Sequence, residues 1–170
     1  MPTVRSTSGK DIKRDELKPG ATPILRTIKS KELIGGIKGF IDEHLSGLIR
    51  FSNESRAPAS AYVNIDVEFF ARFLKELLFL VKAKELIYVT FKGDDEYFGA
   101  EISFNGIPSI SDGDNERLST LATNAGFDIK FGASITVKTK LFRLSFALVY
   151  AVGARKLSKV LENVMFNLHN

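Results

Sequence analysis

Few side chains in this sequence can carry out covalent or metal chemistry. The 170 residues include no cysteine and two histidines, His44 and His169. The lack of cysteine excludes disulfides, thiol nucleophiles and thiolate metal ligands, and two histidines leave little for imidazole catalysis. We therefore expect no catalytic residue, no metal site and no cofactor, and an enzyme is the less favoured interpretation.

The acidic residues form two local groups with different spacing. Residues 94–96 are three adjacent acids between strand-like segments, which is typical of a solvated turn rather than an acid/base pair. Asp112, Asp114 and Glu116 alternate like the first ligands of a calcium loop. The sixth position of such a loop would be Arg117 instead of glycine, so we interpret the segment as a solvated loop and helix cap.

Two groups of basic residues stand out, one in the N-terminal segment and one near the last strands and the last helix. The formal net charge is +4 and the pI is about 9.3, a small excess that suits an acidic partner. The N-terminal group comprises Arg5, Lys10, Lys13, Arg14 and Lys18, and the C-terminal group comprises Lys138, Lys140, Arg143, Arg155, Lys156 and Lys159. We interpret them as a solvated arm and a solvated face, with nucleic-acid binding as an alternative.

The elements that would position these side chains follow from hydrophobic periodicity. Residues 1–26 are polar, include Pro19 and Pro23 and show no sustained periodicity, which predicts a disordered basic arm. Deletion of residues 1–22 should then leave the melting temperature nearly unchanged. Apolar residues recur every three or four positions over residues 30–51, which predicts a helix within an N-terminal segment of residues 27–55.

Four glycines interrupt this predicted helix. Each costs roughly 1 kcal/mol relative to alanine, so close backbone packing must compensate for them. The packing partner is either another part of the chain or a second copy in a homodimer formed by a helical hairpin. The dimer interpretation places these residues at the interface: Ile34, Gly35, Ile37, Gly39 and Ile41.

Residues 56–170 alternate between strand-like and helix-like patterns. We expect a strand at residues 61–65, a long helix after Asp66 and a hairpin of residues 86–91 and 97–104. A short helix over residues 116–125, two strands around Gly132, a turn or bulge at residues 140–142 and an amphipathic helix after Gly153 complete the prediction. The fold class is α+β: a two-layer sandwich of a mixed, mainly antiparallel sheet packed against helices.

The order of these elements from residue 61 to about residue 148 resembles the ATP-binding domain of the gyrase, chaperone, histidine kinase and mismatch-repair superfamily. The specific similarities are Asp66 before the long helix, Glu76 within it, and Asn105-Gly106 after the second hairpin strand. Gly126, between a helix and an isoleucine-containing strand, is a further one. The resemblance covers about half of the chain and implies the fold of the histidine kinase ATPase domain.

The departures from the family remove its nucleotide-handling groups. The resemblance places Leu80 where family members hold magnesium with an asparagine, and apolar leucine cannot ligate this ion. Phe104 replaces the aspartate that binds the adenine amino group, and Pro108 replaces a glycine. Between residues 105 and 115 no glycine-rich lid is present. The vestigial nucleotide pocket would therefore comprise Glu76, Leu80, Phe104, Asn105, Gly106 and Pro108.

His44 is the residue that a phosphotransfer mechanism would require on a helix. It lies beside Asp42 and Glu43, without the proline-containing pattern that usually follows the phosphorylated histidine of histidine kinases. Since the nucleotide residues are also missing, we expect no autophosphorylation and interpret His44 as a surface or boundary residue.

These features indicate a non-catalytic binding or regulatory module that acts through protein contacts in signalling. Two alternatives stay open, a divergent nucleotide-binding protein and a nucleic-acid-binding protein. The chain has no uncharged apolar stretch of about eighteen residues, so we expect a cytoplasmic protein without membrane association. The partner, the pathway and the oligomeric state do not follow from the sequence.

Overall fold

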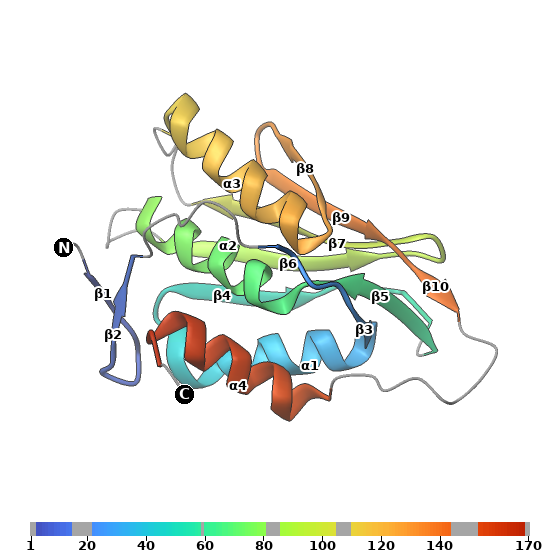
Figure 1. Cartoon of the computed structure of the whole chain (residues 1–170), viewed down its shortest axis with the longest axis horizontal. Coiled ribbons are helices and arrows are strands. Elements are labelled where there is room, and N and C mark those ends of the chain that lie inside the picture. Colours follow the sequence, from blue (N-terminus) through green and yellow to red (C-terminus); the bar gives the residue numbers. More distant parts are fainter. Residues whose placement is uncertain are drawn as a thin grey trace.

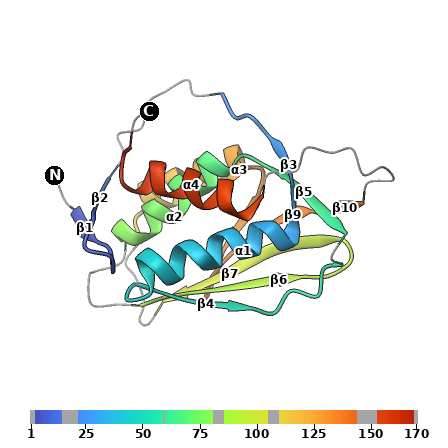
Figure 2. The same cartoon turned by 90° about the horizontal axis from the view of Figure 1, so that it is seen from below.

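The computed structural model describes residues 3–14, 22–58, 60–80, 86–104, 110–143 and 153–168. Within these ranges the chain forms a five-stranded sheet, a three-stranded sheet, an N-terminal hairpin and a set of helices (Figure 1). The predicted α+β class and its two-layer arrangement are confirmed, with the helices α1, α2 and α4 on one face of the five-stranded sheet (Figure 2).

The five-stranded sheet is mixed and mainly antiparallel. Its strand order is β4-β6-β7-β9-β8, in which β4 and β6 are parallel and the other neighbours antiparallel. Buried and exposed residues alternate along β9, as expected for a sheet with one covered face. The strands are β4 (Ile49–Asn53), β6 (Ile87–Gly93), β7 (Tyr97–Phe104), β8 (Asp128–Phe131) and β9 (Ile135–Lys140).

The chain passes from the five-stranded sheet to the three-stranded sheet just after β9. The predicted turn is found at Leu141, which separates β9 from a strand that pairs with residues 61–65 instead. The order is β10-β5-β3, with both pairs antiparallel. Its strands are β3 (Arg26–Lys29), β5 (Ala61–Ile65) and β10 (Phe142–Arg143). The apolar residues 144–148, on which the predicted change of face also depended, lie outside the described residues.

Helix boundaries agree with local capping signals. The Asp66 carboxylate accepts a hydrogen bond from the Phe69 amide at 3.1 Å, which caps the long helix α2. The Ser111 hydroxyl caps α3, so this helix begins one turn earlier than the predicted residue 116. Gly126 ends α3 with φ 101°, the left-handed conformation that glycine accommodates. The helices are α1 (Ser30–Phe40), α2 (Val67–Leu80), α3 (Asp112–Ala125) and α4 (Ala154–Met165).

The core lies between the sheets and the helices. Its largest fully buried aromatic side chains are Phe40, Phe73, Phe91 and Phe98, from helices α1 and α2 and strands β6 and β7. The rings of Phe91 and Phe98 stack with centroids 5.3 Å apart across the hairpin. Within the described part of the chain, no helix is long and apolar enough to cross a membrane.

The predicted helix over residues 30–51 is wrong at its C-terminal end. It continues from α1 into a π-helical turn, η1 (Ile41–Leu45), and residues 49–53 form strand β4. Ile49 pairs with Ile87 in the parallel ladder and is 2% exposed. Pairing of this strand with β6 outweighs its helical periodicity. The local sequence does not reveal this pairing, because the parallel partner lies 38 residues away.

The N-terminal residues were predicted to be disordered, and this expectation is wrong for residues 3–14. They form a short hairpin of β1 (Thr3–Arg5) and β2 (Asp11–Lys13), in which Ile12 is fully buried. The Thr7 amide donates to the His44 carbonyl at 2.7 Å, and the Thr7 hydroxyl accepts from the Gly47 amide at 2.9 Å. These contacts dock the hairpin at the η1 turn and offset its ordering entropy.

Close helix packing within the chain explains one glycine of α1. A Cβ at Gly36 would lie 2.9 Å from the Leu157 Cβ and 3.0 Å from the Ala154 carbonyl oxygen, both in α4. Ile37 and Ile41 are each 1% exposed, so the structure places these two residues in the core and corrects their assignment to a dimer interface. The homodimer itself stays a prediction.

Candidate functional site

Glu76 is the acidic side chain of the predicted nucleotide pocket, and it lies in the third turn of α2. The residue is 3% exposed, on a helix whose neighbouring positions Lys75 and Leu77 are also buried. A carboxylate in such a place must be paired or protonated, because burial of an unpaired charge is costly. The chain provides the partners from two distant segments.

Two guanidinium groups hold the Glu76 carboxylate. Arg14, which follows β2, forms an ion pair with Oε1 through Nη2 and approaches Oε2 with Nε at 3.4 Å. Arg117 of α3 places its Nε 3.1 Å from Oε2. Arg14 also lies 3.7 Å from Asp114. The four side chains form a charge cluster that joins the N-terminal hairpin, α2 and α3.

The electrostatics of this cluster favour the ionised forms. The hydrogen bond to Glu76 raises the pKa of Arg14 above its ordinary value, burial opposes this rise, and the negative charges of Glu76 and Asp114 add to it. Both Glu76 oxygens are engaged with guanidinium nitrogens. A metal ion or a water molecule that bound this carboxylate would have to share it with two guanidinium groups.

The other predicted pocket residues are apolar or lie outside the described residues. Leu80 is the last residue of α2 and Phe104 the last of β7, and both are partly buried against the hydrophobic core. Phe104 pairs with Ile87 across the hairpin. Asn105, Gly106 and Pro108 are among the residues that the structure does not describe. The assignment of a vestigial nucleotide pocket stays a prediction.

Sequence reasoning missed the arginines of the cluster. Arg14 was assigned to a solvated arm, and Arg117 was considered only as a departure from a calcium loop. The signal that could have found them is Glu76 itself, because an acid on the apolar face of a helix requires a cationic partner. The sequence does not indicate which cation, since Arg14 lies 62 residues away from Glu76.

His44 was expected to be a surface or boundary residue, and the structure corrects this to a buried residue, 2% exposed. Its ring packs beside those of Phe40 and Phe166, with centroid distances of 4.8 and 5.0 Å. Nδ1 is 2.7 Å from the Ser8 hydroxyl, and Nε2 is 3.3 Å from Oε1 of Glu162. The docked hairpin and α4 cover the histidine, and neither contact follows from the local sequence.

Comparisons with known proteins give limited similarity. No family model matches the chain. Nonribosomal peptide synthetase 30 of Fusarium vanettenii is 29% identical over 149 residues, which are 85% of this chain. The chain spans about 2% of the length of that protein.

Among solved structures, two nucleotide-free crystal forms of the catalytic domain of the histidine kinase ThkA are similar to the chain. Their TM-scores are 0.45 and 0.44, each with 14% sequence identity and 71% coverage of this chain. The matches cover 95% and 97% of the two ThkA chains. At this level of likeness we transfer no activity from ThkA.

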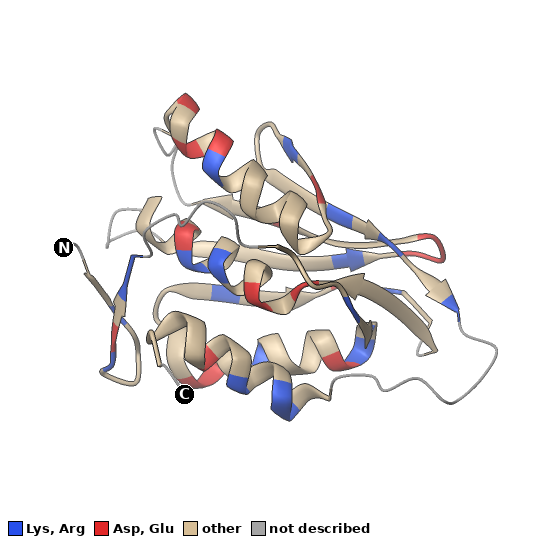
Figure 3. Ribbon diagram, in the orientation of Figure 1, with Lys and Arg blue, Asp and Glu red and all other residues tan. Residues whose placement is uncertain are grey.

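The basic residues of the C-terminal group do not form one patch. Lys138 and Lys140 lie on β9 and Arg143 on β10. Arg155, Lys156 and Lys159 lie on α4, which is separated from β9 by α2 in the view of Figure 3. The Lys138 ammonium lies 4.4 Å from the centre of the Tyr97 ring. Separate groups of charge fit the interpretation of a solvated surface better than a continuous track for nucleic acid.

Proposed function

We propose that this chain is a non-catalytic binding or regulatory module on a degenerate histidine-kinase-like ATPase fold, which acts through protein contacts in a signalling or adaptor setting. One observation carries the proposal: both oxygens of Glu76 are held by Arg14 and Arg117 within the buried charge cluster. The carboxylate serves the fold instead of activating water or ligating magnesium.

The apolar positions support the same conclusion. A magnesium ion bound through nucleotide phosphates needs oxygen ligands, and Leu80 supplies none. An adenine amino group placed against Phe104 would lose its hydrogen bonds to water without a replacement, at a cost of about 1–3 kcal/mol. Because Leu80 and Phe104 pack against the core, they have a structural role that needs no nucleotide.

The similarity to a very long synthetase is compatible with a module of this kind. A segment that corresponds to about 2% of another protein can act there as one domain among many. Domains within long chains commonly act through contacts with their neighbours.

Thermal melting with nucleotide tests the proposal against its first alternative. A ligand present at about 100 times its Kd stabilises a native protein by about 2.7 kcal/mol, which is a shift of several degrees at this size. We expect the melting temperature to be unchanged with Mg-ATP or Mg-ADP. A shift that saturates at micromolar nucleotide would contradict the proposal and favour the divergent nucleotide-binding protein.

The second alternative is tested by electrophoretic mobility or anisotropy with DNA and RNA at several salt concentrations. Nucleic-acid binding would show an affinity that falls steeply with salt, because counterions are released from the phosphates. We expect no saturable binding near physiological ionic strength. A salt-dependent affinity that Arg155→Ala or Lys159→Ala weakens would contradict the module interpretation.

A further inference from the structure

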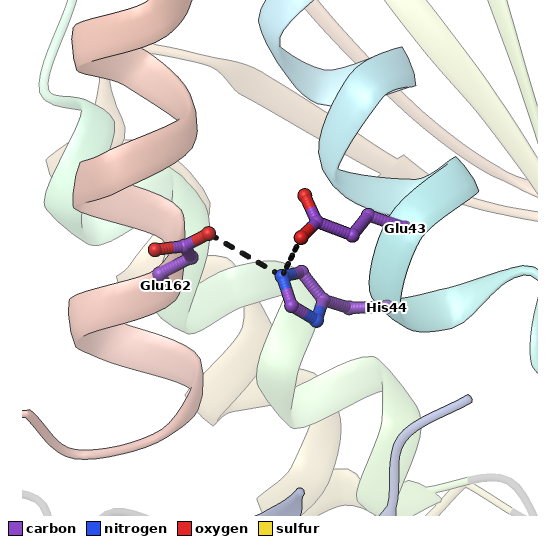
Figure 4. A group of neighbouring side chains, drawn as sticks. All are labelled: Glu43, His44 and Glu162. Carbon is purple, nitrogen blue, oxygen red and sulfur yellow. Dashed lines mark hydrogen bonds and ion pairs between the residues drawn. The ribbon is translucent and has the colours of Figure 1, made fainter. Parts of the chain in front are cut away.

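His44, Glu43 and Glu162 form a second cluster, separate from the charge cluster of Glu76. His44 Nε2 is 3.3 Å from Oε1 of Glu162 and 3.6 Å from Oε1 of Glu43, and the three ligand atoms lie within 4.8 Å of one another. Both carboxylates point toward the same ring nitrogen (Figure 4). An imidazole nitrogen and two carboxylates are a ligand set that divalent transition metals use.

The imidazole is held in the orientation that metal binding requires. Its buried ring packs beside two phenyl rings, and Nδ1 is 2.7 Å from the Ser8 hydroxyl. When Nδ1–H donates to this hydroxyl, the Nε2 lone pair faces the two carboxylates. Metal-bound histidines almost always have such a partner for the second ring nitrogen, which fixes the tautomer and the ring. Ser8 is in turn 3.0 Å from the Ser6 hydroxyl.

Two of the three distances between the ligand atoms are close to those of a zinc site, and all three atoms lie within 4.8 Å of one another. Zinc–nitrogen and zinc–oxygen bonds of about 2.0–2.2 Å in a tetrahedron separate neighbouring ligand atoms by about 3.4 Å. The two nitrogen–oxygen distances of 3.3 and 3.6 Å already have this value. Binding would also require the two carboxylate oxygens to reach the same separation, and the glutamate side chains that carry them are 30% and 64% exposed.

The backbone conformation at Glu43 and His44 is also unusual. Glu43 and His44 lie in the π-helical turn η1, a rare conformation that is frequent at functional sites. Glu162 of α4 lines a groove of about 630 Å³ between α1 and α4, whose wall on α1 is formed by Gly35, Gly36 and Gly39. The groove reaches the cluster at Glu162, and Arg155 and Lys159 also line it, whereas His44 and Glu43 are not among its lining residues.

We propose that His44, Glu43 and Glu162 bind one divalent transition metal ion of the zinc class, with a fourth coordination position open to water or to a ligand in the groove. The sequence predicted no metal site, because the chain has no cysteine and two histidines. The inference does not depend on the proposed function, since it uses none of the nucleotide-pocket residues. The competing arrangement is an ion pair between a protonated His44 and the two carboxylates.

Isothermal titration with ZnCl₂ in a non-chelating buffer tests the site on the full chain freed of metal with EDTA. We expect one zinc ion per chain, and Glu162→Gln and Glu43→Gln should each weaken the affinity by about tenfold or more, since each removes a ligand. Cobalt(II) should give the visible absorption of a low-symmetry, four-coordinate site. Loss of this absorption in the same variants would tie the ion to the cluster.

Matched controls separate this site from adventitious binding. Asp42→Asn removes an exposed acid of the same turn, which pairs with Lys38, and His169→Ala removes the other histidine. Both should keep the wild-type affinity within about twofold, because neither residue belongs to the ligand set. Since His44→Ala opens a gap beside Phe40 and Phe166, the two glutamate variants serve as the primary test.

Three results would overturn the proposal. They are the absence of one-to-one zinc binding below about 100 µM, an unchanged affinity in Glu162→Gln, or a loss of binding in His169→Ala. NMR of the His44 ring before and after the addition of zinc then distinguishes the ion pair from the metal site. A doubly protonated ring that keeps its carboxylate contacts when zinc is added would establish the ion pair and exclude the metal site.

Discussion

At the scale of single residues, the buried charge of Glu76 is compensated by ion pairs between distant segments of the chain. Glu76 lies within the core region and is paired with two arginines from distant segments. Removal of one partner of a buried pair is costly because it leaves the remaining charge without compensation. The pair is thus a structural contact between the N-terminal hairpin and α2, and its strength can be measured directly.

We predict that Arg14→Ala lowers the free energy of unfolding by about 1–3 kcal/mol, with Arg117 compensating part of the lost charge. Glu76→Gln should cost less in the Arg14→Ala background than in wild type, with a coupling of about 0.5–3 kcal/mol. Chemical denaturation of the four proteins measures this cycle. Arg5→Ala, an exposed arginine of the same hairpin, should stay within about 0.5 kcal/mol of wild type. Additive effects of Arg14 and Glu76 would contradict the pairing.

The turn between β6 and β7 provides a pH-dependent prediction. Hydrogen bonds from the Tyr97 and Glu96 amides to Asp94 Oδ1, at 2.9 and 2.8 Å, hold the pKa of Asp94 below its ordinary value of 3.8. A carboxyl with a lowered folded pKa stabilises the native state at pH above its unfolded pKa, and loses this effect as the pH falls through the folded pKa.

Asp94→Asn keeps an oxygen acceptor in the turn and removes the charge. We predict that the difference in unfolding free energy between wild type and this variant is present near neutral pH and disappears under strongly acidic conditions. Denaturant titrations over a range of pH check it. A difference that does not depend on pH would show that the carboxylate charge has no role in the turn.

At the scale of elements, the ends of α4 are fixed by side chains of two other helices. The Glu32 carboxylate of α1 accepts a hydrogen bond from the Ala154 amide at 3.0 Å, at the first turn of α4. The buried Lys75 ammonium of α2 donates to the Val164 carbonyl at 2.9 Å and to the Asn167 amide oxygen at 2.8 Å, at the last turn. An acid at the N-terminus and a base at the C-terminus both interact favourably with the helix dipole and stabilise α4.

The glycines of α1 provide the test of helix packing. We predict that Gly36→Ala destabilises the protein by about 1–3 kcal/mol, because the new methyl group would press on Leu157 and the Ala154 backbone. Gly39→Ala is the matched control, since a Cβ there meets no atom within 4 Å. It should be neutral or stabilise by up to about 1 kcal/mol through helix propensity. Thermal melts that rank the two variants the other way would contradict the α1–α4 packing.

The same elements show what the sequence could predict. Helix α2 and the β6–β7 hairpin follow from local periodicity and capping, so their type and order are confirmed. Strand β4 and the β1–β2 hairpin could not be predicted, because their stability comes from partners far away in the sequence. For the site, the sequence named Glu76 only through the family resemblance. Its arginines, and the contact of His44 with Glu162 over 118 residues, depend on tertiary packing.

At the scale of the whole molecule, the N-terminal hairpin belongs to the folded unit. It buries Ile12, contacts the η1 turn through Thr7 and supplies Arg14 to the charge cluster. Ser8 also orients His44. The segment thus contacts both clusters of buried polar residues, although its strands are only three residues long.

Deletion of residues 1–14 should therefore destabilise the protein, in contrast to the expectation for a disordered arm. The lost burial of Ile12 and the lost ion pair together are worth about 3 kcal/mol or more, which lowers the melting temperature by about 6–12 °C. Differential scanning calorimetry of the full chain and the truncated chain measures this. Melting temperatures within a degree or two of each other would show that the hairpin contributes nothing to the fold.

The most direct test of the central claim is a calorimetric titration of the full chain with Mg-ATP. If Glu76 is a structural carboxylate held by Arg14 and Arg117, and Leu80 and Phe104 replace the polar groups of a nucleotide pocket, millimolar Mg-ATP should give no saturable heat. The same result is expected for Glu76→Gln. A Kd in the low micromolar range for the wild type, lost in Glu76→Gln, would contradict the account and make the chain a nucleotide-binding protein.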